Sequence, residues 1–399
     1  MRYTNLVNLE HKMWSTALAQ DVAQQTICLL GSPGIGKTST AITLADQMTE
    51  AVKGDRALAE KIFGKGNVPA EIPKALCRVL DLSSMLPEDL NGLPFRDGET
   101  TKFCGHEWLH EMCQPGAYGV LCLDDLPAAA PMMQVAARQI SLERRVHDHR
   151  LSPGIFIVVT GNRREDKSAA STLPAHFRNS VMLLNVDIDV DDWCKWLGAQ
   201  EHSNQIIAGY LRWKREQLSM LPKDALPVGA AFATPRSWAK LAAVFDVADS
   251  TGTLFDVARG LVGEGVATSF ASFVKVRNSL VDPEKVFDNP EKALPNPDTL
   301  NSPDKIIAMA TSLGEIAAAR SKHGKKGQKA DAPLKLLRAL AWTTQNHREY
   351  CGSGVSTYIS VGGQSVLPQL VKVARANRSD PVVGQLLTFL KSALLEGNG

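Results

Sequence analysis

The residues with the clearest chemical potential form one short loop, Gly31–Thr38. It reads Gly-Ser-Pro-Gly-Ile-Gly-Lys-Thr, and its G-x-x-x-x-G-K-T spacing is typical of a phosphate-binding loop. Glycines let backbone N–H groups close around phosphate oxygens without Cβ clashes, and the helix that follows contributes its dipole. We expect Lys37 to reach the β- and γ-phosphates of ATP and the Thr38 hydroxyl to hold Mg²⁺. The predicted nucleotide-binding residues are Gly31, Ser32, Pro33, Gly34, Ile35, Gly36, Lys37, Thr38 and Ser39.

Two acids and an amide further along the chain are candidates for the rest of the site. Asp124 and Asp125 follow the apolar run 119–123, which is the Walker B pattern. In that pattern the first acid orients Mg²⁺ and its waters, and the second lies near the water that attacks the γ-phosphate. Asn162 follows the most β-branched apolar run of the sequence. Ligands bind beyond the carboxyl ends of parallel strands, so Lys37, Asp124 and Asn162 are expected to converge there.

Strand-like and helical patterns alternate along the first half of the chain. Continuous apolar runs predict strands at 27–30, 78–85, 119–125, 155–162 and 181–186. Because helical patterns separate these runs, they predict a parallel sheet with helices on both faces. A helix is expected over residues 131–146, with an inward face made of Met132, Val135, Ala136, Ile140 and Leu142. Pro87–Pro94, by contrast, has the prolines, asparagine and glycine of an ordered loop.

Composition limits the classes of protein to consider. With 399 residues, 44% of them hydrophobic and 22% charged, the chain is long enough for two or three domains with real cores. The formal net charge is only +2, without the general basic excess of many nucleic-acid-binding proteins. The seven cysteines lack the spacing of a disulfide framework, which indicates a reducing compartment. Neither a signal peptide nor an apolar run of roughly 18–20 residues is visible, so a cytoplasmic protein without a membrane segment is expected.

Seven segments, in their order and spacing, make the chain resemble the AAA+ ATPases of the MoxR type. Between about residues 24 and 275 they read GSPGIGKT, DLSSMLPEDLNGLPF, LCLDDLPAAAPMMQ, VVTGNR, LPAHFRN, DDWCKWL and TPRSW. The resemblance implies an α/β fold with an AAA+ P-loop NTPase core, in which a parallel sheet lies between helices. The implied domains are the core at 1–187, an α-helical lid at 188–250 and a mostly α-helical C-terminal extension at 251–399. The extension is expected to contain a linker near 282–303 and a mobile loop near 321–332.

The resemblance also implies roles for particular residues and a kind of assembly. Asn162 corresponds to sensor 1, which positions the attacking water, and Arg236 corresponds to sensor 2, a lid arginine that contacts the γ-phosphate. Arg178 corresponds to the arginine finger, which a subunit supplies to its neighbour's nucleotide. Proteins of this family usually form hexameric rings and often act with a partner that carries a von Willebrand factor A domain. The predicted function is therefore ATP hydrolysis that drives the remodelling or assembly of a partner protein complex.

Two departures from the family pattern leave an alternative open. The second Walker B acid is Asp125 where glutamate is usual, and Ser180 stands where relatives often have a second arginine. Both changes could slow hydrolysis, and the chain would then be a nucleotide-gated assembly platform that binds ATP but barely hydrolyses it. Other arginines near the expected finger position are Arg144, Arg145, Arg163 and Arg164.

Two further motifs allow weaker interpretations. His106–His110 spells H-E-x-x-H between Cys104 and Cys113, a zinc-protease pattern whose residues could also form a structural zinc site. The segment is short, it precedes Pro115-Gly116, and it lies where the family has a variable stretch, so a chance match is favoured. The basic stretch 322–329 could contact nucleic acid, but a charge run is more often a solvated surface. A nucleic-acid motor is accordingly the weakest alternative.

Overall fold

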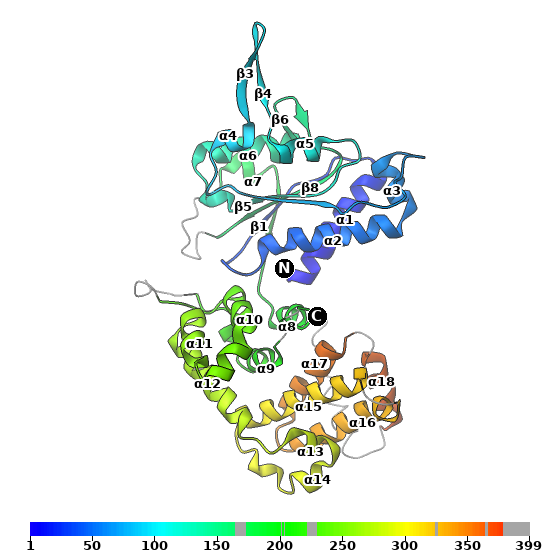
Figure 1. Cartoon of the computed structure of the whole chain (residues 1–399), viewed down its shortest axis with the longest axis vertical. Coiled ribbons are helices and arrows are strands. Elements are labelled where there is room, and N and C mark those ends of the chain that lie inside the picture. Colours follow the sequence, from blue (N-terminus) through cyan, green and yellow to red (C-terminus); the bar gives the residue numbers. More distant parts are fainter. Residues whose placement is uncertain are drawn as a thin grey trace. The chain divides into compact units, whose positions relative to one another are not determined.

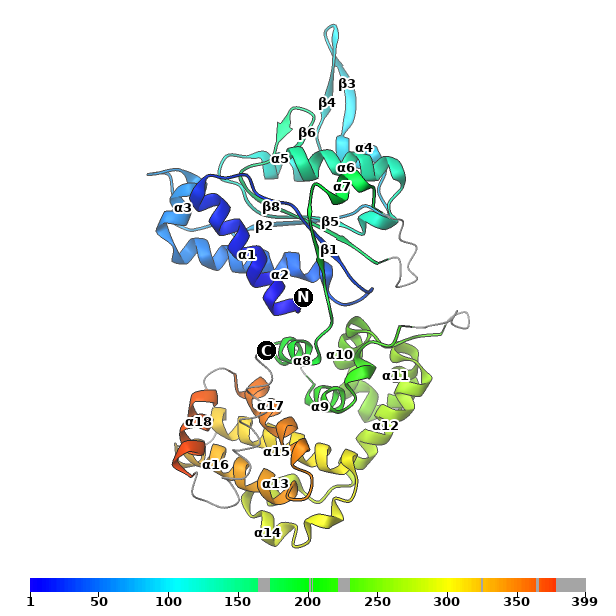
Figure 2. The same cartoon turned by 180° about the vertical axis from the view of Figure 1, so that it is seen from behind.

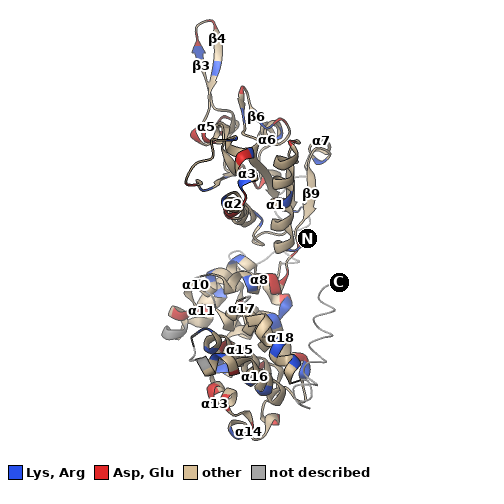
Figure 3. Cartoon of the chain, turned by 90° about the vertical axis from the view of Figure 1, so that its right-hand side faces the viewer, with Lys and Arg blue, Asp and Glu red and all other residues tan. Residues whose placement is uncertain are grey.

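The computed structural model describes residues 1–163, 173–200, 202, 204–221, 230–323, 326–363 and 366–377. It consists of two compact units, Met1–Asp189 and Val190–Gly399, and each is described by itself (Figures 1 and 2). Among the described residues, no helix has both the length and the apolar character needed to span a lipid bilayer. Lys and Arg positions are interspersed with Asp and Glu positions over both units (Figure 3), in keeping with the formal net charge of +2.

A parallel five-stranded sheet forms the centre of the first unit. Its strand order is β2-β5-β8-β1-β9, and every pairing is parallel. The strands are β1 (Ile27–Leu30), β2 (Leu76–Asp81), β5 (Tyr118–Asp124), β8 (Gly154–Gly161) and β9 (Met182–Asn185). Leu30 pairs with Gly161 and Asp81 pairs with Asp124, so the carboxyl ends of the strands meet at one edge of the sheet. The predicted α/β fold with a parallel sheet between helices is confirmed at this level.

Helices cover both faces of this sheet (Figure 1). Alternate strand residues point to opposite faces, so that Ile27 and Leu29 belong to one core and Cys28 belongs to the other. The first core is closed by α1 (Tyr3–Gln20), α2 (Lys37–Gly54) and α3 (Arg56–Phe63). The second is closed by α4 (Pro87–Asn91), α5 (Glu107–Cys113), α6 (Pro131–Glu143) and α7 (Ala175–Arg178). The central strands β5, β8 and β1 are buried on both faces and are largely apolar, as the sequence indicated, whereas the edge strands β2 and β9 are partly exposed.

Two β-hairpins and a short 3₁₀ helix complete the first unit. They are β3 (Leu93–Asp97) with β4 (Thr100–Cys104), β6 (Arg145–Val146) with β7 (His149–Arg150), and η1 (Leu126–Ala128). The β3–β4 hairpin stands away from the sheet in both views (Figures 1 and 2), and the Phe103 ring near its base stacks on His147 with centroids 3.8 Å apart. The sequence analysis did not predict this hairpin. Most of its residues are exposed, so no buried alternating pattern marks its strands.

The prediction of a loop at Pro87–Pro94 is wrong for its first half. Residues Pro87–Asn91 form α4, which has proline at its first helical position. Proline is favoured there because the first N–H groups of a helix have no intrahelical acceptor. The Asp89 carboxylate accepts the Leu86 N–H at 2.8 Å and caps the helix start.

The predicted inward face of the helix after β5 is also wrong. In α6 the buried apolar residues include Met133 and Ile140, whereas Met132 and Val135 are 74% and 65% exposed. Both sets of residues follow helical spacing and share Ile140, so periodicity alone did not choose between them. The buried face includes Gln134, whose side-chain amide donates to the Ala129 carbonyl at 3.0 Å. That hydrogen bond satisfies the side-chain N–H of Gln134, so a polar residue outside the predicted set can lie on the buried face.

The second unit is helical over its described residues. Its longer helices are α8 (Val190–Gly198), α9 (Gln205–Trp213), α10 (Pro235–Thr251), α11 (Leu254–Val262), α12 (Glu264–Asn278), α15 (Pro303–His323), α16 (Lys326–Thr343), α17 (Cys351–Gly362) and α18 (Val366–Ala376). Its short ones are α13 (Pro283–Asp288), α14 (Pro290–Ala293), η3 (Arg215–Leu218), η4 (Pro297–Thr299) and η5 (Arg348–Tyr350). Tyr210, Trp238 and Phe270 pack their rings together, with centroids 5.1 to 5.8 Å apart.

Two expectations for this unit differ from the structure. The predicted linker near 282–303 contains α13 and α14, and the side chains of Val286 and Phe287 are buried in the core. Prolines start both helices and the preceding Asp282 and Asn289 side chains cap them, so residues that suggested a linker are helix-start signals here. In the predicted mobile loop near 321–332, all described residues belong to α15 or α16. The subdivision into core, lid and extension stays a prediction.

Candidate functional site

The loop between β1 and α2 has the backbone shape that its glycines indicated. Gly34 and Gly36 adopt φ values of +76° and +94°, a region that residues with a Cβ rarely occupy. A Cβ at Gly31 would lie 2.6 Å from Ile35 Cδ1 and 2.8 Å from the Val186 carbonyl oxygen, so only glycine fits there. Gly36 precedes α2 without a side chain to cap it. The first N–H groups of α2 therefore open toward the loop, the arrangement that suits a phosphate.

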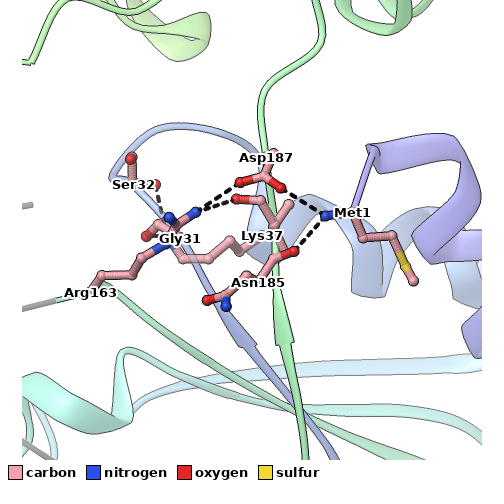
Figure 4. Close-up of polar contacts among 8 residues, drawn as sticks. Met1, Gly31, Ser32, Lys37, Arg163, Asn185 and Asp187 are labelled. Atoms are coloured by element: carbon pink, nitrogen blue, oxygen red, sulfur yellow. Dashed lines mark hydrogen bonds and ion pairs between the residues drawn. The ribbon is translucent and has the colours of Figure 1, made fainter.

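The Lys37 side chain is folded into this loop. It is only 8% exposed, and its Nζ donates to Gly31 O at 2.8 Å and to Ser32 O at 2.9 Å (Figure 4). A third hydrogen bond joins Nζ to Asn162 Oδ1 at 2.9 Å. Lys37 starts α2 and Asn162 directly follows β8, so the sheet edge brings together two residues that lie 125 positions apart.

The two acids at the end of β5 lie beside this lysine. Thr38 Oγ1 donates to both oxygens of the Asp124 carboxylate, at 2.9 and 3.0 Å. The Thr160 hydroxyl, from the neighbouring strand β8, donates to the same carboxylate. Mg²⁺ is usually bound by one or two carboxylates while it keeps several waters. Asp124 and the Thr38 hydroxyl fit such a cation, and the described residues contain no group of three metal-binding side chains that would suit a fuller protein cage.

Asp125 is held in an unusual conformation next to Asp124. Its φ is +54°, in the left-handed region that non-glycine residues seldom adopt. The pKa of its carboxyl is raised, mainly because the group is partly buried and also because the Asp124 charge is close. Asn162 Nδ2 donates to Asp125 Oδ1 at 3.3 Å. Asn162 thus bridges Lys37 and Asp125 through the two ends of its amide.

A second polar group surrounds the end of β9 (Figure 4). Arg163 Nη2 donates to Val186 O at 2.8 Å and to Asp187 Oδ1 at 3.2 Å. The Met1 ammonium contacts the other Asp187 oxygen at 3.0 Å and Asn185 O at 2.6 Å. The hydrogen bond from the ammonium, with a smaller contribution from Arg163, lowers the pKa of Asp187. Arg163 is therefore engaged within its own chain.

The arginines proposed to act on the nucleotide have different surroundings. Arg178 ends α7 with an exposed side chain, and its side chain makes no hydrogen bond or ion pair to another described residue. Arg236, the second residue of α10, belongs to the second unit and is exposed. The predicted roles of both stay predictions.

Most of the other candidates for the arginine finger make hydrogen bonds or ion pairs within the chain. Arg144 donates to the carbonyls of Ser152 and Ile155, and burial lowers its pKa to about 10. Arg145 pairs with Glu143 at 2.8 Å. Arg164 lies outside the described residues. Of the candidates that the structure describes, Arg178 is the one whose side chain is exposed and makes no hydrogen bond or ion pair to another described residue.

The histidine motif does not form the zinc site that its spelling suggests. His106 precedes α5 instead of lying within it, so His106 and His110 do not share a helix face. Its Nε2 contacts the Glu88 carbonyl oxygen at 3.0 Å. No three of the histidine, cysteine and acidic side chains that the structure describes are grouped to bind a metal.

The sequence analysis did not identify Thr160 as a residue of the site. Thr160 lies on β8, two residues before Asn162, which directly follows that strand, and residues two apart along an extended chain face the same side. That spacing was a usable signal, because a polar residue inside an otherwise apolar strand needs a partner.

No model of a known protein family matches the chain, and no curated protein sequence matches it either.

Proposed function

We propose that the protein is an ATP-binding and ATP-hydrolysing AAA+ protein of the MoxR type. The observation that carries the proposal is the hydrogen-bond chain from Lys37 through Asn162 to Asp125, beside the Thr38–Asp124 pair. Each of these residues comes from a motif that the resemblance assigned independently. A glycine-rich turn that matched the loop pattern by chance would have no reason to have an amide hydrogen-bonded both to its lysine and to one of two adjacent acids.

The proposed binding step uses groups that are already in place. Lys37 would exchange the carbonyls of Gly31 and Ser32 for phosphate oxygens of ATP, which are stronger acceptors because they are charged. When bound, Mg²⁺ would neutralise the charge that develops on the phosphates. The Thr38 hydroxyl and the Asp124 carboxylate would hold it through direct and water-mediated contacts.

The proposed hydrolytic step uses Asp125 and Asn162. Once phosphate replaces it at Lys37, the Asn162 carbonyl is released to accept a hydrogen bond from the attacking water. Asp125 would take the proton of that water, and its raised pKa brings it closer to the operating pH than an ordinary aspartate. Arg178 would reach the nucleotide of a neighbouring subunit in a hexameric ring, and Arg236 would contact the γ-phosphate from the lid. The energy of hydrolysis would remodel a partner protein, possible partners including one with a von Willebrand factor A domain.

A second candidate function follows from one geometric detail. Asp125 is one methylene shorter than glutamate, and its contact with Asn162 is long for a hydrogen bond, at 3.3 Å. If the carboxylate does not reach the water, the protein would bind ATP and assemble with little hydrolysis. Turnover of the assembled protein separates this nucleotide-gated platform from the remodelling ATPase.

The lysine provides the direct test of the proposed site. Lys37→Ala removes a charged donor whose hydrogen bonds contribute about 1.5–3 kcal/mol each, so ATP affinity should fall by about 10–100-fold or more. Lys53→Ala is the matched control, because Lys53 lies on the same helix but is exposed and paired with Glu50. Titration of both variants with a fluorescent ATP analogue measures the difference. Equal affinities in Lys37→Ala and the wild type would remove the loop from nucleotide binding.

A further inference from the structure

Thr160 occupies the point where the two acids of the candidate site meet. It lies on β8 with 1% of its surface exposed. Its hydroxyl donates to Asp124 Oδ1 and accepts the Asp125 backbone N–H, with 3.3 Å between that nitrogen and Thr160 Oγ1. A hydroxyl has one proton and two lone pairs, so this single group serves both acids at once.

We propose that Thr160 is a positioning residue for ATP hydrolysis, which orients Asp124 toward the cation and Asp125 toward the attacking water. The inference rests on the proposed ATPase function. It adds a residue that contacts neither nucleotide nor metal and acts through the two acids.

The two oxygens of Asp124 have different sets of hydrogen-bond donors. Thr38 donates to both oxygens, while Thr160 donates to Oδ1 alone. When a lone pair of the Thr38 oxygen holds a cation, the single Thr38 proton can still donate to Asp124, but it does not by itself distinguish the two carboxylate oxygens. Thr160 then keeps Oδ1 in place, and Oδ2 is left to accept hydrogen bonds from water bound to the cation. The Thr160 hydroxyl thereby selects which Asp124 oxygen faces the metal.

Thr160 also contacts the backbone of Asp125. A residue with φ of +54° is held against its own preference, so contacts around it must favour that conformation. The Asp125 N–H donates a hydrogen bond to Thr160 Oγ1. Its side chain, in turn, is directed to Asn162 Nδ2. Loss of the hydroxyl would leave the N–H without its acceptor and let the carboxylate move away from Asn162.

The test compares Thr160→Val, which keeps the shape and removes the hydroxyl, with Thr160→Ser, which keeps the hydroxyl. Turnover is measured against Mg²⁺ concentration at saturating ATP. Loss of a group that orients a metal ligand typically costs 10–100-fold in metal affinity or activity, so we expect about that loss in Thr160→Val. Thr160→Ser should stay close to the wild type. Affinity for a fluorescent ATP analogue without Mg²⁺ should be the same in all three proteins.

Thr49→Val is the matched structural control. Thr49 is also a buried threonine of the first unit, and its hydroxyl also donates once, to Ala45 O, and accepts once, from the Ala75 N–H. It lies away from the acids, so its loss should leave the Mg²⁺ dependence unchanged. If Thr160→Val does not fold, Thr160→Cys keeps the volume with a weaker donor, and its loss should lie between those expected for serine and valine.

The outcomes separate this inference from the function on which it rests. Wild-type turnover with an unchanged Mg²⁺ dependence in Thr160→Val, or in Thr160→Cys, would overturn the positioning role alone. An equal loss in Thr160→Ser would also overturn it, because the hydroxyl would then not be the group that matters. Absence of turnover in the wild type would overturn the proposed ATPase and the inference with it.

Discussion

The Lys37 ammonium donates a hydrogen bond to Asn162 Oδ1 at 2.9 Å, which joins the loop after β1 to the end of β8. The same amide donates to Asp125, so the lysine proposed to bind phosphate and the proposed base are both hydrogen-bonded to Asn162. In the proposed function, a phosphate that draws Lys37 away would free the acceptor end of Asn162. Nucleotide binding and preparation of the hydrolytic site would thereby be linked through a single side chain.

Asp125 is expected to be required for turnover and dispensable for binding. Asp125→Asn removes the proton acceptor, and loss of a general base typically costs about 10²–10⁴ in rate. ATP affinity should stay near the wild-type value, because Lys37 and Thr38 are unchanged. Steady-state phosphate release and analogue titration measure the two properties separately.

Asp125→Glu is the informative companion to that variant. It introduces the acid that is usual in the family that the chain resembles, and it lengthens the side chain by one methylene. Turnover equal to or above the wild type is expected if the acid acts as a base. Full turnover in Asp125→Asn would exclude Asp125 from catalysis.

Arg178 is expected to act on the nucleotide of a neighbouring subunit. Arg178→Ala should lower turnover by about 10³-fold or more, the range reported for loss of an arginine finger. Its exposed position at the end of α7 suits such a role, whereas a lost structural contact would lower stability instead. Phosphate release by the purified variant measures the loss.

Mixed assemblies distinguish action between subunits from action within one. Arg178→Ala subunits keep an intact base, and Asp125→Asn subunits keep an intact finger, so a mixture should regain activity that neither has alone. Mixing Arg178→Ala with the double variant Asp125→Asn/Arg178→Ala is the control and should regain none. Equal behaviour of the two mixtures would assign the arginine finger to another residue.

A buried acid outside the site should make the first unit less stable at high pH. Glu10 on α1 is fully buried, and neither of its carboxylate oxygens has a hydrogen-bond partner among the described residues. Burial raises the pKa of its carboxyl from 4.5 to about 8. The folded state therefore binds this proton more tightly than the unfolded state does. The contribution of this proton to the free energy of unfolding is fully present below about pH 4.5. It is lost as pH rises to about 8.

Glu10→Gln removes this titration while keeping the side-chain shape. Relative to the wild type, the variant should gain stability as pH rises from 4.5 to 8 and keep a constant advantage above that. The difference is at most about 5 kcal/mol, at 1.36 kcal/mol for each unit of pKa. Chemical denaturation across this pH range measures it, with Glu50→Gln on the exposed face of α2 as control. A difference that does not vary with pH would mean that Glu10 does not titrate in this range.

The sequence predicted those parts of the site that depend on local order. The loop 31–38 needs its glycines and lysine at fixed spacing, and the central strands β5, β8 and β1 are largely apolar because both of their faces are buried. The orientation of α6 was not predictable in this way, since the faces containing Met132 and Met133 are both helically spaced. Tertiary packing against the sheet made that choice.

The contact of Thr160 with the two acids is a second feature that could not be predicted from the sequence. Asp124 and Thr160 lie 36 residues apart, and only the register of β5 against β8 brings them together. Register depends on long-range pairing, which a pattern within one strand does not specify. The left-handed backbone of Asp125 is likewise a consequence of the turn between β5 and η1, not of its residue type.

The central claim is that the subunits together form a Mg²⁺-dependent ATPase site. The most direct measurement is ATP turnover per subunit with Mg²⁺, over a range of protein concentrations, with bound nucleotide quantified in the same samples. Turnover that rises more steeply than the protein concentration would mean that neighbours complete each site, as the account predicts. Turnover near zero at every concentration, with ATP bound, would contradict it and favour the assembly platform.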